Sequence, residues 1–127
     1  MLKLATLPNH PNAAANIFLL CRRRLIEGWV SWAMLEEYSD VLARFPNVLA
    51  AVGETFECCH ALDELDLIAH EPDNRFVECA LACDADYLIT VNTARGHFDQ
   101  PCYGRTRVLT PGRFLNLDEV QSLLTRL

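Results

Sequence analysis

Residues His70–Phe98 read H-E-P-D-N-R-F-V-E-C-A-L-A-C-D-A-D-Y-L-I-T-V-N-T-A-R-G-H-F. The stretch places a carboxylate, Asp73, at the start of a helix predicted over 74–83, and then supplies a short apolar strand, Tyr87–Thr90, followed by Asn92. In a parallel sheet the carboxyl ends of strands and the amino ends of helices meet at one edge, where such folds build their sites. The stretch therefore predicts an α/β fold and one half of a polar site.

The rest of the chain alternates helical patterns with short apolar strands. The other expected helices lie at about 13–27, 33–44 and 47–62, with a short helix from Pro111, capped by Thr110, and a last helix after Leu117. Gly28 is expected to end the first of them. The other expected strands are Trp29–Ser31, Leu65–Ala69 and Arg107–Leu109. This alternation predicts one domain over residues 1–127, a short parallel sheet flanked by helices.

The composition is that of an ordinary globular domain, with 127 residues of which 51% are apolar and 22% charged. No apolar run reaches the roughly 18 residues that a membrane span requires. The start of the chain lacks the long apolar core of a signal peptide, so we expect a cytoplasmic protein without a membrane anchor. The formal charge of −6 argues against broad binding to nucleic acid, because phosphate contacts need Lys and Arg. It does not exclude a nuclease, whose metal-binding carboxylates add negative charge.

Six cysteines are present, and none forms a C-x-x-C pair. Cys58-Cys59-His60 would supply part of a zinc site, but no second pair of ligands follows at metal spacing. Cys79 and Cys83 are four positions apart and share a helical face, as buried core residues do. We expect reduced, mostly buried thiols.

Four polar residues are placed for metal chemistry: Glu37, Asp73, Glu78 and Asn92. Hydrolysis of a phosphodiester by a two-metal route needs carboxylates that converge on Mg²⁺ or Mn²⁺. Each residue also has a simpler interpretation, because an Asp at a helix start is usually a cap and a helical Glu usually faces solvent. Glu36 and Glu37 point about 100° apart, so only one can face the site, and Glu37 lies at the edge of the apolar stripe.

Other catalytic chemistry fits less well, because G-x-S-x-G, H-E-x-x-H and a phosphate-cradling glycine loop are all missing from the sequence. His97 lies in the irregular segment 91–106 and is placed to assist phosphate binding, although an ordinary loop histidine is the simpler interpretation. Local basic spots occur at Arg22–Arg24 and at Arg95, Arg105 and Arg107, and solvated surface is the simplest interpretation of both.

Three ordered motifs resemble the PIN-domain family, and most closely its branch of toxin components from toxin–antitoxin systems. They are S-W-A-M-L-E-E-Y-S-D-V-L-A-R-F-P at 31–46, E-P-D-N-R-F-V-E-C-A at 71–80 and A-D-Y-L-I-T-V-N at 85–92. The ending V-L-T-P-G-R-F-L at 108–115 also matches, and the resemblance covers roughly 8–117.

The resemblance implies a three-layer α/β sandwich and a Mg²⁺- or Mn²⁺-dependent ribonuclease. By position, Glu37 and Asp73 would be acidic ligands and Asn92 would stand where many members have Asp. With Glu78 from the spacing argument, the expected metal ligands are Glu37, Asp73 and Glu78, and the expected catalytic residues are Glu37, Asp73 and Asn92. Family members are often dimers that a small antitoxin neutralises, so the resemblance also implies RNA, an antitoxin and a second copy of the chain as partners.

The N-terminus departs from the family, which opens with a strand that ends in Asp-Thr-Asn. In one alignment Leu2–Thr6 is that strand and its Asp is replaced; in the other, which we favour, Met1 falls after the signature and the central strand is truncated or lost. A missing first Asp predicts weak metal binding. The alternatives are therefore an active ribonuclease, an inactive module that binds RNA or a protein, or a truncated product without a present role.

Overall fold

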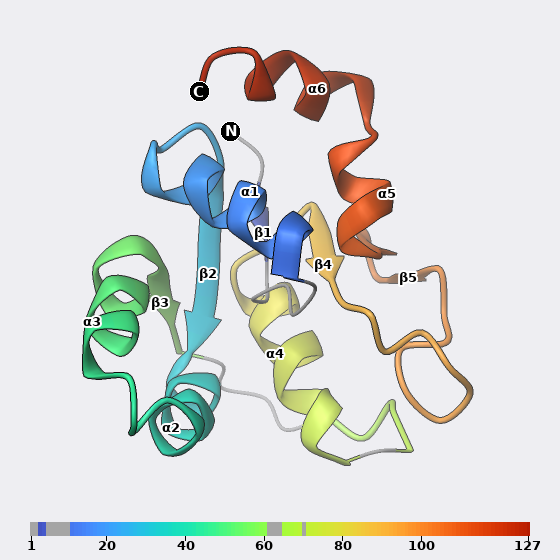
Figure 1. The fold of residues 1–127 in the computed structure, drawn as a ribbon. Coiled ribbons are helices and arrows are strands. Elements are labelled where there is room, and N and C mark those ends of the chain that lie inside the picture. Colours follow the sequence, from blue (N-terminus) through green and yellow to red (C-terminus); the bar gives the residue numbers. More distant parts are fainter. Residues whose placement is uncertain (1–2, 5–10, 61–64, 70) are drawn as a thin grey trace.

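The computed structural model describes residues 3–4, 11–60, 65–69 and 71–127 (Figure 1). Its helices are α1 (Pro11–Arg22), α2 (Trp32–Val41), α3 (Pro46–Thr55), α4 (Asn74–Ala82), α5 (Pro111–Leu115) and α6 (Asp118–Leu124), and a 3-10 turn, η1 (Glu71–Asp73), precedes α4. Its strands are β1 (Lys3–Leu4), β2 (Glu27–Ser31), β3 (Glu57–Cys59), β4 (Tyr87–Ile89), β5 (Cys102–Tyr103) and β6 (Thr106–Leu109).

The strands form one sheet in the order β3-β2-β1-β4-β6-β5. All neighbours are parallel except β5, which runs antiparallel to β6. Leu4 of β1 pairs with Gly28 on one side and with Tyr87 on the other. The favoured alignment, in which the chain begins after its central strand, is therefore wrong, because residues 3–4 occupy that central position. In the other alignment the strand Leu2–Thr6 ends at residues 5 and 6, which lie outside the described residues.

Helices cover both faces of this sheet. The connection through α1 leads from β1 to β2, whereas α4 connects β3 to β4 in the opposite direction across the sheet. Because such crossovers are right-handed, the reversal places α1 and α4 on opposite faces. The packing agrees, since α1 contacts α5 and α6 while α4 contacts α2, β2 and β4. This is the predicted α/β layering. The direction in which the helical connections cross the sheet changes between β1 and β4.

The first helix ends earlier than its apolar pattern predicts. It stops at Arg22, and Arg24 takes a positive φ of 59° before the chain enters β2. Gly28 does not end a helix as predicted but lies inside β2, where the ring of Phe56 packs against it so closely that a Cβ atom would overlap the ring. Close approach of an aromatic ring is therefore the role of this glycine.

Two further predictions were wrong between 47 and 69. The predicted helix at 47–62 ends at Thr55, and Glu57–Cys59 instead pair with β2 as strand β3. The predicted strand Leu65–Ala69 is irregular. Its backbone amides are bound by side chains of α4 rather than by a neighbouring strand: Leu65 donates to Glu78, and Leu67 and Ile68 donate to Asn74.

The C-terminal half follows its predicted pattern closely. Helix α4 and strands β4 and β6 lie where expected, and Thr110 accepts a hydrogen bond from the amide of Arg113 at the start of α5. Leu88 and Ile89 are completely buried, as is Phe114 from α5. Strand β5 was not predicted. Among the residues that the structure describes, no helix has the length and apolar character needed to cross a membrane.

Candidate active site

Asp73 is a buried carboxylate at the carboxyl edge of the sheet. It closes η1 and directly precedes α4, yet its side chain makes no capping hydrogen bond to that helix. Only 5% of the residue is exposed. Its Oδ2 atom lies 2.8 Å from Nδ1 of His97, a residue of the loop that follows β4. The cap interpretation of this Asp is thus not supported, and the carboxylate instead joins two segments at the site edge.

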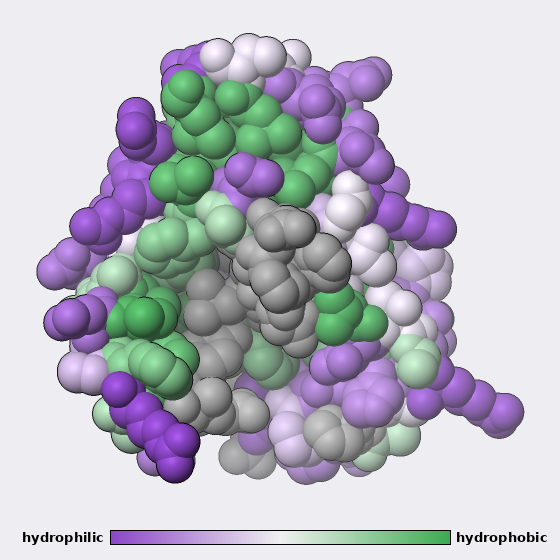
Figure 2. Space-filling view, in the orientation of Figure 1, coloured by the Kyte–Doolittle hydropathy of each residue, from purple (hydrophilic) through white to green (hydrophobic). Residues whose placement is uncertain are grey.

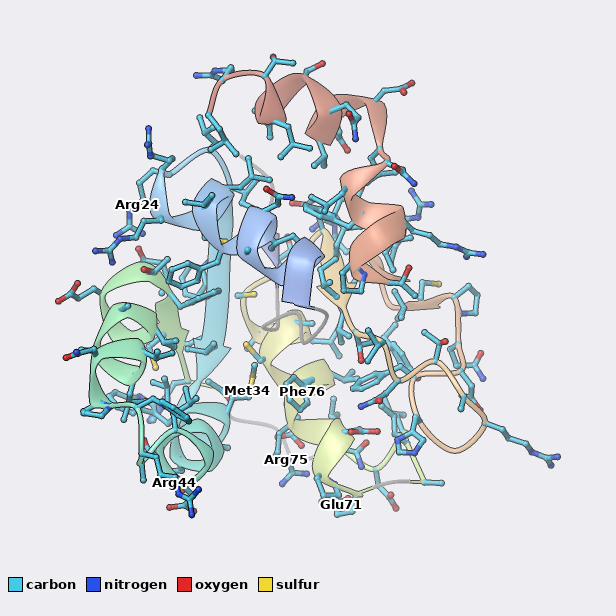
Figure 3. The ribbon with its side chains drawn as sticks, viewed as in Figure 1. Arg24, Met34, Arg44, Glu71, Arg75 and Phe76 are labelled. Carbon is cyan, nitrogen blue, oxygen red and sulfur yellow. The ribbon has the colours of Figure 1, made fainter. Side chains whose placement is uncertain are left out.

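The loop that carries His97 is anchored in the core by Phe98. This side chain is 3% exposed and packs edge-on against Phe76 of α4, with ring centroids 6.0 Å apart, and against Tyr103, at 6.5 Å. Figure 3 labels Phe76 on α4, beside this loop. The amide of Phe98 donates to the carbonyl of Asn92 at 3.0 Å, which closes the loop. Residue 97 is therefore held beside the first turn of α4 by apolar packing and by a backbone hydrogen bond.

Asn92 lies at the mouth of the same loop, just past the end of β4. Its amide donates to the hydroxyl of Thr90 at 3.0 Å, and its side chain is exposed. Figure 2 shows hydrophilic side chains over the lower right of this face, where this loop runs in Figure 1. Thr93 and Arg95 of the loop are exposed. Asn92 thus begins the loop that Asp73 contacts through His97, and its role in a site stays a prediction.

Glu78 faces a different part of the molecule. It is five positions after Asp73, about 140° around a helix. Its Oε2 atom accepts from the guanidinium of Arg75 at 2.8 Å and from the amide of Leu65 at 2.9 Å. Both contacts are structural, because they neutralise a buried carboxylate and fix the irregular segment at 65–69 to α4. Its assignment as a metal ligand stays a prediction, and these contacts do not support it.

Glu37 lies within α2, which starts immediately after β2 at the carboxyl edge. The hydroxyl of Ser31 caps this helix by accepting from the amide of Met34 at 3.2 Å. The neighbouring Glu36 is exposed. Helix α2 also packs against α4, so the backbone of Glu37 belongs to the end of the molecule that holds Asp73. The side chain of Glu37 is outside the described part of the structure, and its ligand role stays a prediction.

Asn74 was not predicted from the sequence. Its side chain holds Leu67, Ile68 and Glu71 against the start of α4. This residue is completely buried beside Asp73. Its Oδ1 accepts from the amides of Leu67 and Ile68, and its Nδ2 donates to the carbonyls of Ile68 and Glu71 and to the Glu71 carboxylate. Figure 3 shows Glu71 and Arg75 near the start of α4, where they form an ion pair of 2.9 Å. An Asn immediately after the helix-start Asp was the available signal.

Three arginines of the two basic spots are engaged in contacts within the fold. Arg22 pairs with Glu54 at 3.4 Å, Arg24 donates to the carbonyl of Thr55, and Arg105 pairs with Asp86 at 2.7 Å. The surface interpretation of these spots is therefore supported. Arg95 is exposed on the same loop as His97.

Burial and negative charge both act on Tyr103, which packs under this loop. Burial is the largest cause of its raised pKa, and the charges of Asp99 and Asp73 add to the increase. The negative charge of Asp73 therefore contributes to the raised pKa of Tyr103, which packs against Phe98 beneath the loop of His97.

The donor chemistry at Asp73 fits a hard divalent cation. It is a buried carboxylate oxygen donor that is not used as a helix cap, and Mg²⁺ and Mn²⁺ prefer such oxygen ligands. Within the described ranges, no group of three or more His, Cys, Asp or Glu side chains is arranged to hold a metal ion. Glu37, on α2, stays the predicted second carboxylate of this site.

Comparison with known proteins gives one positive result. The family model for the PIN domain matches residues 4–94, a range that includes Leu4 of β1, α2, Asp73 and Asn92. No curated protein and no solved structure gave a significant match. The matched range exceeds half of the 127 residues and agrees with the α/β sheet and its site edge. The chain therefore belongs to the PIN domain family, whose members are generally nucleases.

Proposed function

We propose that the protein is a ribonuclease that uses Mg²⁺ or Mn²⁺ bound at the carboxyl edge of its sheet. The observation that carries the proposal is the buried, non-capping carboxylate of Asp73, held 2.8 Å from His97 beside the loop of Asn92. A carboxylate that serves only as a cap would bond to the first amides of α4. The position of Asp73 instead matches the place where a doubly wound sheet binds its ligands.

In this proposal Asp73 and Glu37 hold the cation, and Asn92 contributes an uncharged amide oxygen at the rim. The bound ion would polarise the phosphate and lower the pKa of the attacking water. His97 fixes the orientation of the Asp73 carboxylate through Nδ1, as groups behind metal ligands commonly do. Arg95, exposed on the same loop, attracts the phosphate backbone of the RNA.

Cleavage of a labelled RNA with Mn²⁺, compared with chelator, tests the proposal. Asp73→Asn keeps the shape of the side chain but removes the charge, and should lower the rate by at least about 100-fold if this carboxylate holds the catalytic ion. Asp118→Asn, an exposed residue of α6, is the matched control and should cleave at the wild-type rate. Cleavage that persists in chelator and in Asp73→Asn would sink the proposal.

A module that binds RNA or protein without cutting is the second candidate. It is favoured by the state of Glu78, whose carboxylate is already neutralised by Arg75 at 2.8 Å. Fewer available carboxylates mean weaker binding of a divalent ion. Calorimetric titration with Mn²⁺ separates the candidates, because tight binding that is lost in Asp73→Asn contradicts the inactive module.

The resemblance to toxin components supports three further proposals: a cytoplasmic location, a homodimer, and neutralisation by a small antitoxin. Light scattering coupled to gel filtration measures the molar mass of the protein in solution and so tests the homodimer directly. A monomeric mass at high protein concentration would contradict the dimer.

A further inference from the structure

Two buried thiols from separate elements meet on one side of the sheet. Cys59 is the last residue of β3, Cys79 lies in the middle of α4, and their Sγ atoms are 3.2 Å apart. Cys79 is completely buried and Cys59 is 8% exposed. Both cysteines are free thiols in this structure. They are 20 positions apart in the chain, so this contact is a product of the fold rather than of local helix geometry.

We propose that Cys59 and Cys79 form a redox-reactive pair that hydrogen peroxide converts to a reversible disulfide between β3 and α4. The sulfur atoms are already in contact, so the bond requires a small shift and no rearrangement of the sheet order. The pair takes no part in the proposed cleavage of RNA, and the inference stands whether or not the protein is a nuclease.

The two thiols differ in reactivity in the way that such a reaction needs. The pKa of Cys59 is lowered, chiefly by its hydrogen bond with the Cys79 thiol, although burial acts in the opposite direction. The thiolate is the form that attacks peroxide. The pKa of Cys79 is raised by the same hydrogen bond, by Cys83 and by burial. By contrast, burial raises the pKa of Cys21 to about 12, which leaves that thiol inert.

The chemistry balances without a cofactor. The Cys59 thiolate attacks one oxygen of hydrogen peroxide, the O–O bond breaks, and the products are a sulfenic acid on Cys59 and one water after protonation. The Cys79 sulfur then attacks the Cys59 sulfur, the S–O bond breaks, and the leaving hydroxide takes the Cys79 proton as a second water. Two thiols are oxidised by two electrons, and one peroxide is reduced to two waters.

Access to Cys59 comes from its position at the margin of the sheet. Strand β3 is an edge strand of the sheet. It pairs only with β2 among the described strands and is three residues long. Cys58 and His60, on either side of Cys59, are exposed. Short edge segments with one partner open at low free-energy cost, so small oxidants reach Cys59 without unfolding of the core.

Peptide mapping of the wild-type chain tests the pair directly. The native protein is treated with graded hydrogen peroxide, denatured, alkylated and digested, with and without prior reduction. We expect the chain to lose the mass of two hydrogen atoms, one cross-linked peptide to contain Cys59 and Cys79, and both thiols to become alkylatable again after dithiothreitol. A cross-link at another pair, or full alkylation of Cys59 and Cys79 after treatment, overturns the proposal.

Serine variants give an independent readout. Cys59→Ser and Cys79→Ser should each abolish the loss of two hydrogen atoms, whereas Cys58→Ser and Cys102→Ser, at exposed positions, should retain it. Circular dichroism establishes that each variant is folded before oxidation. If Cys79→Ser fails to fold, Cys59→Ser together with the wild-type map still decides the question. Formation of the same cross-link in unfolded but not in native protein would also count against the proposal.

Discussion

The Nδ1 atom of His97 lies 2.8 Å from Oδ2 of Asp73, although the two residues are 24 positions apart. The side chain of Asp73 is 7% exposed and that of His97 is 35% exposed. The histidine therefore stands between the buried carboxylate and solvent, and this relationship connects the helix-start residue of α4 to the loop after β4.

Replacing His97 should weaken the site without unfolding the domain. His97→Phe removes the hydrogen bond to Asp73 and should lower Mn²⁺ affinity and RNA cleavage about 10- to 100-fold, the usual cost of losing a group behind a metal ligand. His97→Asn, which retains a short side chain with an amide donor, should recover part of both. Calorimetry and cleavage assays measure the effect, and unchanged Mn²⁺ affinity in His97→Phe would contradict the positioning role.

Glu78→Gln should reduce stability rather than chemistry. The substitution keeps an acceptor for the amide of Leu65 but removes the charge that faces Arg75, which costs roughly 1–3 kcal/mol in a mostly buried pair. Urea denaturation measures the loss, and cleavage per folded molecule should stay at the wild-type level. A selective loss of Mn²⁺ binding at wild-type stability would instead support Glu78 as a metal ligand.

Asn74→Ala should be among the most destabilising polar substitutions in the chain. It removes the hydrogen bonds that link Asn74 to Leu67 and Ile68 and leaves the buried amide of Ile68 without this acceptor. We expect a loss of roughly 2–4 kcal/mol in the free energy of unfolding. Asn116→Ala, at an exposed position after α5, is the control and should change stability by less than about 0.5 kcal/mol. Equal effects of the two substitutions would refute the argument.

Gly28→Ala and Gly53→Ala form a matched pair. A Cβ atom at Gly28 meets the ring of Phe56, so overpacking should cost roughly 1–3 kcal/mol. A Cβ atom at Gly53 meets nothing within 4 Å, and Ala is the better helix former in α3, so that change should stabilise by up to about 1 kcal/mol. Thermal unfolding distinguishes the two, and opposite signs are the expected result.

The elements that were predicted correctly are those in which local pattern and tertiary packing agree. Helix α4 shows an apolar stripe and β4 is a short β-branched and apolar run, and both lie where the sequence placed them. Gly28 was misassigned because a glycine after an apolar helical pattern normally ends the helix. Its actual partner, Phe56, is 28 positions later by residue number, and no local pattern contains that contact.

The position of the candidate site could be predicted from the sequence. The side-chain contacts that hold its residues in place were harder to predict. Asp73 and Asn92 follow from the rule that parallel strands present their carboxyl ends at one edge. The contact of Asp73 with His97 depends on Phe98 packing against Phe76, which is a tertiary event. Similarly, Leu65–Ala69 has the apolar composition of a strand, but side chains of Asn74 and Glu78 bind its amides. Side chains that replace a neighbouring strand cannot be recognised from periodicity.

The placement of β1 has a consequence for the order in which the fold assembles. Strands β2 and β3 can pair while residues 27–59 are the only part of the sheet available, and β4, β6 and β5 can pair within 87–109. The first strand in the chain joins these two halves, with Leu4 as the residue that pairs with both. The two halves of the sheet thus meet at β1, and we expect hydrogen exchange to report opening along β1 before opening within either half.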